Sequence, residues 1–259
     1  MDDAGWSDTA QTTYVFDTEG SKTLYAWAKD AAGNISNSAS DSVEVTIGLI
    51  PTEGLVSYWS FDGNALDNYG SNNGTVVGAT LTTGVSGDAS TAYGFDGVND
   101  YITSSAPGGL TSATISVWVK LNSLSPESQY NLFAYTFGGQ GAGSHDKDLS
   151  VDSTGKAFFY IWDGGGKAAI STTTLSTGIW YHIVGVTNGS ATKIYINSVL
   201  ENSVNSGASY GGGNSFVMSF IKVSDGWGRY LNGTLDKVRV YNRALTAGEV
   251  LALYAQETP

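Results

Sequence analysis

Apolar and polar residues alternate along most of the chain in short runs, and this pattern predicts β-strands. Early in the sequence, such runs cover Thr12 to Asp17, Thr23 to Lys29 and Ser42 to Ile47. Successive side chains of a strand point to opposite faces, so a period of two indicates strands with one buried face. Asp30-Ala31-Ala32-Gly33-Asn34 predicts a turn after the second run, because Asp, Gly and Asn favour turn conformations.

The same alternation continues after residue 55, with turn-forming residues between many of the runs. No helical pattern separates these runs, so we expect an all-β fold built from two packed antiparallel sheets. A single short helix is predicted near the end, where Thr246 and Glu249 form a capping box ahead of apolar residues. The predicted strands are Val56 to Phe61, Thr75 to Val77, Ala92 to Phe95, Tyr101 to Ser104, Ala113 to Lys120, Asn131 to Phe137, Leu149 to Asp152, Lys156 to Trp162, Lys167 to Thr172, Trp180 to Thr187, Thr192 to Ile196, Val199 to Ser203, Phe216 to Ile221 and Gly233 to Tyr241.

Composition narrows the class of protein. The net charge is −12, which argues against nucleic acids and anionic membranes as partners. The chain has no cysteine, which excludes disulfides and thiolate metal sites. No apolar run approaches the roughly 20 residues that span a membrane. The first residues are acidic and do not resemble a signal peptide, so we expect the sequence to be part of a longer secreted protein.

Glycine and proline interrupt the strand pattern between residues 48 and 55, which we interpret as a linker. The segment from Leu24 to Ser36 resembles the last hairpin of bacterial immunoglobulin-like repeats. That resemblance implies that residues 1–47 are the end of a truncated immunoglobulin-like spacer, since a full repeat needs about 100 residues. The alternative is a short strand layer that belongs to this protein. The main domain is expected over residues 56–259.

Six segments of the main domain, taken in order, resemble the laminin-G-like (concanavalin A-like) jelly rolls. The resemblance implies a two-sheet antiparallel jelly-roll sandwich, with Trp59, Trp118 and Trp180 packed in its core and His182 as a structural residue. It implies little about the ligand, because one fold serves many functions. The segments are Gly54 to Gly63, Asp67 to Thr75, Phe95 to Ile102, Thr114 to Lys120, Trp180 to Gly185 with Ile194 to Asn197, and Leu231 to Thr246.

The sequence does not favour an enzyme. Glycoside hydrolases use two carboxylates about 5 to 9 Å apart, and jelly-roll glucanases place them on one strand as Glu-x-Asp-x-x-Glu. No two glutamates of this chain lie within five residues of each other, so that motif is absent. His145 and His182 are the only histidines, and no Gly-x-Ser-x-Gly elbow precedes either. We therefore expect a non-catalytic domain.

The resemblance also implies a structural calcium ion that joins the first and last strands of the jelly roll. Calcium prefers carboxylate and carbonyl oxygens. Asp236 is the best candidate ligand and Asp62 the second, with Asn64 and Gly94 as possible carbonyl donors. The alternative for both aspartates is turn capping or an ion pair with Arg239 or Arg243.

Aromatic residues outside the family pattern suggest where a glycan would bind, because sugars stack on aromatic rings. Alternation places Phe158, Tyr160 and Trp162 on one face of a strand, and a glycine-rich turn follows Trp162. Trp227 lies between glycines, where we expect it to be exposed. The other predicted ligand-binding residues are polar: Arg229, Asp225 and Lys222 near Trp227, and His145 and Asp146 after a long glycine-rich loop.

The sequence thus predicts a secreted, lectin-like module that binds a polysaccharide through these aromatic residues, next to other domains of the same parent chain. Two alternatives stay open at this point. One is an adhesion or spacer module without glycan binding. The other is a hydrolase or lyase with a site that the motifs do not reveal.

Overall fold

The computed structural model describes residues 7, 9, 20–105, 110–124, 131–137, 145–208, 215–222 and 228–258. The chain divides into two compact units, Met1–Gly48 and Leu49–Pro259. In the first unit, β1 (Gly20–Ala26) pairs antiparallel with β2 (Ala39–Val45). A single bridge between Lys29 and Ile35 closes the turn expected after Asp30. The predicted run Thr12 to Asp17 lies outside the described residues.

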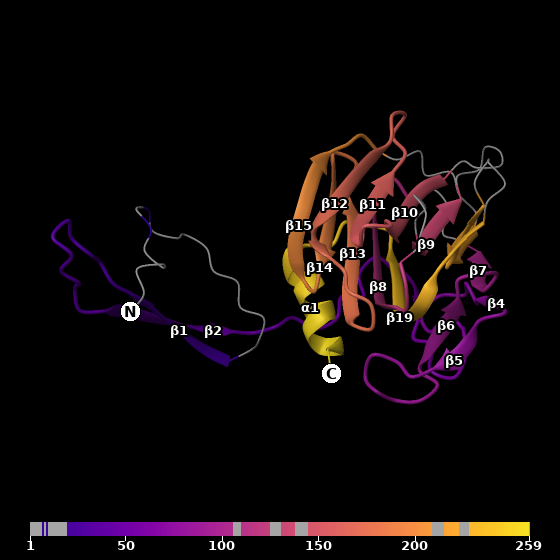
Figure 1. Ribbon diagram of the computed structural model, residues 1–259, viewed down its shortest axis with the longest axis horizontal. Coiled ribbons are helices and arrows are strands. Elements are labelled where there is room, and N and C mark those ends of the chain that lie inside the picture. Colours follow the sequence, from indigo (N-terminus) through magenta and orange to yellow (C-terminus); the bar gives the residue numbers. More distant parts are fainter. Residues whose placement is uncertain are drawn as a thin grey trace. The chain divides into compact units, whose positions relative to one another are not determined.

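The second unit is a sandwich of two antiparallel sheets, which confirms the predicted fold class (Figure 1). A small hairpin, β17 (Phe220–Lys222) with β18 (Gly228–Tyr230), lies beside them. One sheet has seven strands in the order β12 (Lys167–Thr174), β11 (Lys156–Ile161), β10 (His145–Val151), β9 (Asn131–Phe137), β16 (Ser215–Met218), β7 (Tyr101–Ser105) and β4 (Thr75–Val77). The other has eight in the order β15 (Val199–Asn205), β14 (Ala191–Ile196), β13 (Trp180–Thr187), β8 (Ala113–Leu121), β19 (Asn232–Tyr241), β6 (Ala92–Asp96) and β5 (Thr80–Thr82), with β3 (Leu55–Trp59) added onto β19.

The core lies between the two sheets and is made of the inward side chains of both. The rings of Trp59 and Phe216 stack with their centroids 5.2 Å apart, which joins β3 of one sheet to β16 of the other. Phe159 of β11 lies over Gly185 of β13, and a methyl group on that glycine would lie 2.3 Å from the ring. Interdigitated packing of this kind leaves little room for added atoms.

Most predicted strands occur, and the differences have local causes. The predicted run Phe216 to Ile221 is divided into β16 and β17, because Ser219 takes a left-handed backbone conformation with a φ of +75°. That residue cannot continue a strand. The edge strand β5 was not predicted from the sequence.

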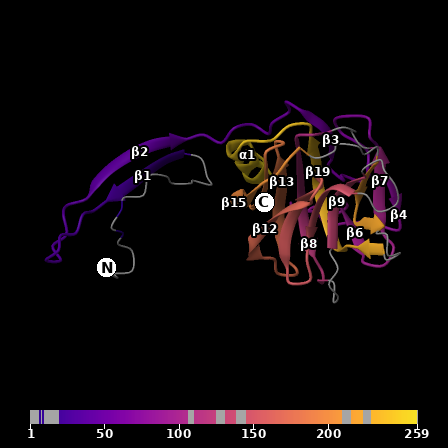
Figure 2. The same ribbon diagram turned by 90° about the horizontal axis from the view of Figure 1, so that it is seen from above.

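The helix α1 (Ala247–Glu257) begins at the predicted capping box, in which Thr246 and Glu249 exchange hydrogen bonds. The helix covers part of the outer face of the eight-stranded sheet (Figure 2). At its last turn, Glu257 accepts a hydrogen bond of 3.0 Å from the Trp118 indole and pairs with Arg239. The Arg239 guanidinium also lies 3.8 Å from the centre of the Tyr58 ring.

Two of the three family tryptophans are buried as predicted, and so is His182. Trp59 is in the core between the sheets, whereas Trp118 is buried on the opposite face of its sheet, under α1. His182 stacks on Trp118, and burial lowers the pKa of its imidazole to about 3. Trp180 is a correction to the prediction: it is half-buried at the end of β13, with the Lys120 ammonium 5.0 Å from its ring.

Residues interpreted as a linker make ordered contacts with the jelly roll. Tyr241 donates a hydrogen bond to the carbonyl of Pro51, and Arg243 donates one to the carbonyl of Glu53. Gly54 has a φ of +70°, and a side chain there would collide with Asn242 and Arg243. The segment from residue 50 to 54 is therefore held in place on the second unit.

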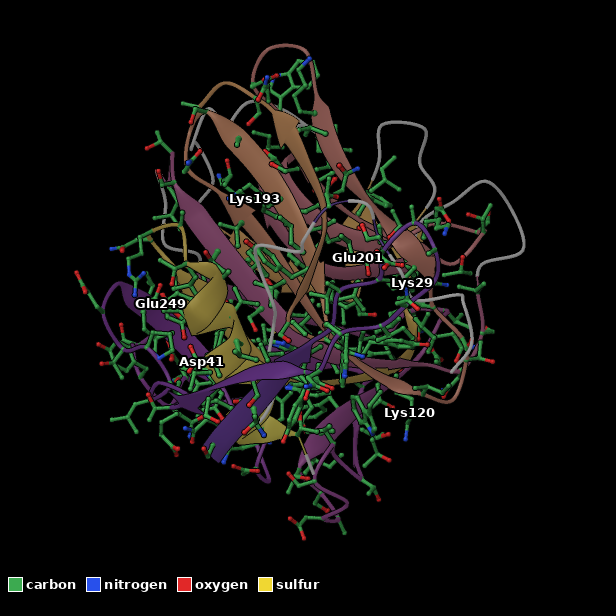
Figure 3. The ribbon with its side chains drawn as sticks, turned by 90° about the vertical axis from the view of Figure 1, so that its left-hand side faces the viewer. Lys29, Asp41, Lys120, Lys193, Glu201 and Glu249 are labelled. Carbon is green, nitrogen blue, oxygen red and sulfur yellow. The ribbon has the colours of Figure 1, made fainter. Side chains whose placement is uncertain are left out.

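Where β15 and β12 adjoin, one carboxylate joins the two sheets. Glu201 of β15 accepts hydrogen bonds from the backbone amides of Thr172 and Thr173, at 2.9 and 2.8 Å, and from both of their hydroxyls. These bonds lower the pKa of Glu201 against the effect of its burial. Figure 3 labels Glu201 here and Glu249 on α1.

Replacing Gly185 with alanine should destabilise the sandwich, because the new methyl group would push Phe159 out of the core. We expect a loss of about 1 to 3 kcal/mol in the free energy of unfolding, measured by chemical denaturation. Gly248→Ala is the matched control, since its new methyl group meets nothing within 4 Å. An equal loss in both variants would contradict the close packing at Gly185.

Replacing Glu249 with glutamine should destabilise the protein in a pH-dependent way. Hydrogen bonds from Arg243 hold the pKa of Glu249 at about 2, below its ordinary value of 4.5. Because the folded-state pKa is depressed, this contribution is present above pH 4.5 and is lost as the pH falls towards 2. The difference between wild type and Glu249→Gln should therefore shrink from pH 7 to pH 2.5 in denaturation curves. A constant difference over that range would count against this ion pair.

Candidate functional site

The candidate site lies on the outer face of the seven-stranded sheet, over β10, β11 and β12 (Figure 1). In β11 the inward residues Phe159 and Ile161 are buried, whereas Phe158 and Tyr160 are half-buried on the other face. This confirms the predicted alternation. The register places Asp148 and Ala168 beside Tyr160, and Ser150 and Ile170 beside Phe158. The outer face therefore combines aromatic, aliphatic and polar side chains.

Trp162 follows directly after β11 and is 44% exposed. The turn that begins with it is held by Asp163, which accepts hydrogen bonds from the backbone amides of Gly165 at 3.1 Å and Gly207 at 2.9 Å. The Tyr160 hydroxyl packs against Gly166 of the same turn, 2.8 Å from where a methyl group would lie. These contacts fix the backbone that presents the exposed indole.

Among the described residues, two carboxylates act on the Tyr160 phenol. Burial raises the pKa of the Tyr160 phenol, and the negative charges of Asp148 and Asp163 raise it further. The pKa of Asp163 is lowered, chiefly by the hydrogen bond from Gly207, so this group is ionised at neutral pH. The Tyr160 phenol is thus neutral at neutral pH.

Of the predicted ligand-binding residues, Tyr160 and Trp162 are those whose side chains the structure describes at this place. Trp227 and Asp225 lie outside the described residues. His145, Asp146, Lys222 and Arg229 are described by their backbone alone, in β10, β17 and β18. The hairpin of β17 and β18 lies beside β9, with β10 between β9 and β11.

Sequence reasoning missed Asp148, Asp163 and Ile170 as neighbours of the aromatic residues. Asp148 and Ile170 are on other strands, so only the register of the sheet places them there. Ile170 is 47% exposed although it is aliphatic. A usable signal was present for Asp163, because an Asp directly before three glycines is typical of a turn in which the side chain binds backbone amides.

The predicted metal ligand Asp236 lies in β19 at a β-bulge. The register shifts between Asp236 and Arg239, and Lys237 takes a left-handed φ of +47°. Leu235 and Val238 enter the core, so the extra residue lets Asp236 and Arg239 both face outwards. Asp236 is almost fully buried: its Oδ2 accepts a hydrogen bond of 2.9 Å from Val85, and its Oδ1 has no protein partner.

The other predicted calcium ligands are placed differently from Asp236. The Asp62 side chain is exposed, and Asn64 caps its own turn by accepting a hydrogen bond from Leu66. That turn is nevertheless tied to the loop beside Asp236, since Gly63 donates a hydrogen bond to the carbonyl of Ser90. Gly94 is paired on both sides, with Thr80 and Thr234, so its carbonyl faces a neighbouring strand.

The residues around Asp236 fit a hard cation. A buried carboxylate oxygen without a partner is unfavourable, and burial raises the pKa of Asp236 to about 6. Within the described ranges, no three acidic or histidine side chains gather as a metal site. Further ligands would therefore be backbone carbonyls, and Thr91 lies beside Asp236 in the loop next to Gly84. The alternative ion pairs do not form, because Arg239 pairs with Glu257 and Arg243 with Glu249.

Comparison with solved structures shows the same fold in several carbohydrate-active and binding proteins. Domain 4 of the extracellular arabinanase AbnA from Geobacillus stearothermophilus, solved with arabinotriose, has a TM-score of 0.61 at 22% identity, and the match covers 79% of this chain and 98% of that domain. Trypanosoma rangeli sialidase has a TM-score of 0.62 at 18% identity, and the match covers 80% of this chain and 33% of the sialidase. The botulinum neurotoxin serotype D binding domain has a TM-score of 0.60 at 15% identity, and the match covers 79% of this chain and 52% of that domain.

These likenesses show the fold alone, since all the identities are below 25%. None of the curated proteins compared with the chain matches it in sequence. No helix in the described part of the chain is long and apolar enough to cross a membrane.

Residues 96–251 match the family described as the concanavalin A-like lectin/glucanases superfamily. Because this match spans more than half of the sequence and agrees with the two-sheet sandwich, the chain belongs to the concanavalin A-like lectin/glucanases superfamily.

Proposed function

We propose that this protein is a non-catalytic carbohydrate-binding module that acts outside the cell and binds a polysaccharide at the end of β11. The observation that carries the proposal is the exposed indole of Trp162, fixed by the turn that Asp163 holds. An exposed aromatic ring next to hydrogen-bonding groups is the arrangement by which proteins recognise the apolar faces and the hydroxyls of sugars. The arabinotriose bound to the arabinanase domain of the same fold is in line with this proposal.

The surroundings of Trp162 supply both parts of such a site. Ile170 adds exposed apolar surface along the same face, and the Tyr160 hydroxyl lies against Gly166 of the turn. Asp163 accepts one backbone hydrogen bond on each carboxylate oxygen and keeps lone pairs for a sugar hydroxyl. A flat sugar ring can thus stack on the indole while its hydroxyls bond to the rim.

The glutamates of the sandwich support a non-catalytic role. Three of those that the structure describes hold protein contacts: Glu201 with Thr172 and Thr173, Glu249 with Arg243, and Glu257 with Arg239 and Trp118. A glycosidase needs two carboxylates that face one cleft and stay available for proton transfer and nucleophilic attack. These three side chains stabilise the fold instead.

Replacing Trp162 with alanine should weaken polysaccharide binding at least tenfold, because the stacking surface is lost while the fold is kept. This corresponds to about 1.4 kcal/mol. The measurement is affinity electrophoresis or calorimetry against a panel of neutral polysaccharides that includes arabinan. Trp27→Ala is the matched control: Trp27 is 48% exposed and belongs to the first unit.

Three outcomes would oppose this proposal. Equal binding by wild type and Trp162→Ala would place the glycan elsewhere on the molecule. Absence of binding to every polysaccharide tested would favour an adhesion or spacer module, and release of sugar products would favour a hydrolase or lyase.

We also propose that a calcium ion binds at Asp236 and joins the bulge of β19 to the loop before β6. The unpartnered Oδ1 and the nearby Thr91 carbonyl support this site. A bound divalent cation would neutralise the buried carboxylate and draw together segments that are far apart in sequence.

Removal of calcium with a chelator should lower the Tm of the wild-type protein, because calcium binds the folded state and not the unfolded chain. Calcium at one hundred times its Kd should add about 2.7 kcal/mol. Asp236→Asn should make the Tm insensitive to both calcium and chelator, as measured by calorimetry. Asp88→Asn, in the neighbouring loop, is the control. A wild-type Tm that does not respond to calcium would rule out this site.

A further inference from the structure

The edge strand β12 carries a bulge next to the candidate site. Lys156 of β11 pairs with Thr174, and Phe158 pairs with Ile170. One residue separates the two paired positions on β11 and three separate them on β12, so β12 carries two extra residues. A bulge interrupts the ladder of backbone hydrogen bonds and changes the direction of the strand. This one directly follows Ile170, whose exposed side chain belongs to the face on which the glycan is proposed to bind.

Two neighbouring residues of β15 hold this bulge from the other sheet. The side-chain amide of Asn202 donates a hydrogen bond of 3.0 Å to the carbonyl of Ile170. Glu201 accepts hydrogen bonds from the backbone amides of Thr172 at 2.9 Å and Thr173 at 2.8 Å, and from both of their hydroxyls. Because β12 is the last strand in the order of its sheet, these two side chains take the place that a further strand would have.

The bulge also has partners in its own sheet. The ammonium of Lys156 donates a hydrogen bond to the carbonyl of Thr172, and the hydroxyl of Ser171 donates one of 2.7 Å to the carbonyl of Thr173. Glu201 differs from these partners because it binds two consecutive amides at once. Without its carboxylate, both amides lose their partner, and the course of β12 at the bulge is no longer fixed from the other sheet.

Glu201 is ionised at neutral pH. Burial raises the pKa of its carboxyl group, but the hydrogen bonds from Thr172 and Thr173 lower it by more, so the pKa lies below the ordinary value of 4.5. Hydrogen bonds to a charged acceptor are shorter and stronger than those between neutral groups. The bonds that Glu201 accepts are therefore of the kind that holds a strand in one position.

We propose that Glu201 is a positioning residue of the glycan site: it holds the bulge of β12 and thereby fixes Ile170 on the ligand face. This inference rests on the proposed function, in which Ile170 supplies apolar surface along the face that leads to Trp162. Glu201 acts through Ile170, because four hydrogen bonds to β12 occupy its own carboxylate. A side chain that is already held in its bound position loses less conformational freedom when a ligand packs against it, and affinity rises accordingly.

The experiment measures affinity by calorimetry, with soluble arabinan, xylan and mannan as probes, well below the lowest Tm of the variants. The polymer that the wild-type protein binds most tightly is used throughout. We expect Ile170→Ala and Glu201→Ala each to weaken binding at least threefold. Glu201→Gln keeps an oxygen that can accept hydrogen bonds from the two amides, and its affinity should stay within twofold of wild type.

A double-mutant cycle tests whether Glu201 acts through Ile170. If it does, Glu201→Ala causes no further loss in a protein that already carries Ile170→Ala, and the double variant binds within about 1.5-fold of Ile170→Ala. Two independent effects would instead multiply. Asn202→Ala removes the hydrogen bond to the Ile170 carbonyl and replaces Glu201→Ala in the cycle if that variant does not fold; it should weaken binding at least twofold.

Glu249→Ala is the matched control for a general loss of stability. It also removes a hydrogen-bonded carboxylate, but at the start of α1, where Arg243 and Thr246 are the partners. We expect this variant to lower the Tm and to leave the affinity for the polymer unchanged.

The outcomes separate this inference from the proposed function. Unchanged affinity in Glu201→Ala or in Ile170→Ala, independent losses in the double variant, or an equal loss in Glu249→Ala would each overturn the positioning role. Loss of binding in Trp162→Ala would show in the same experiment that the polymer still uses the candidate site. Absence of wild-type binding to all three polymers would overturn both the inference and the proposed function.

Discussion

The packing of α1 onto the eight-stranded sheet covers part of the outer face of that sheet. Each sheet buries one face in the shared core, so function must use the remaining faces. On the eight-stranded sheet, Glu257 of the helix holds Trp118 and Arg239, and His182 stacks beneath it. On the outer face of the seven-stranded sheet, Tyr160 is half-buried and Trp162 is exposed beside the end of its strand, and the proposed glycan site is on this face.

The helix α1 also covers a buried ion pair between Arg239 and Glu257. Arg239 and Glu257 are both removed from water, and such pairs stabilise a fold only when their partners are complete. Here the Tyr58 ring covers the guanidinium and the Trp118 indole donates to the carboxylate, whereas the buried Nε of Arg239 has no hydrogen-bond partner among the described residues. The bulge at Lys237 makes this possible, because it turns both Asp236 and Arg239 to the same face. One inserted residue thus serves the helix contact and the proposed calcium site together.

Membership of the superfamily establishes the architecture of the protein. It does not establish the ligand, which depends on the side chains at the binding site. The arabinanase domain, the sialidase and the neurotoxin domain share the sandwich, although they are parts of different proteins. A fold that is common to several functions carries little information about any one of them. In this chain the proposed ligand site is at the turn after β11, where Asp163 holds the backbone and Trp162 is exposed.

The sequence by itself determined the alternation that makes the strands, the capping box that begins α1, and the shared face of Phe158 and Tyr160. These features depend on residues close together in the chain, where the period of side chains is enough. Only the tertiary structure decided which strands are neighbours, and so which residues join the candidate site. Asp148 and Ile170 reach Tyr160 and Phe158 through strand register, Gly185 meets Phe159 across the core, and Asp236 meets Val85 through a bulge. Contacts between distant segments depend on pairing and packing, and no local pattern of residues encodes them.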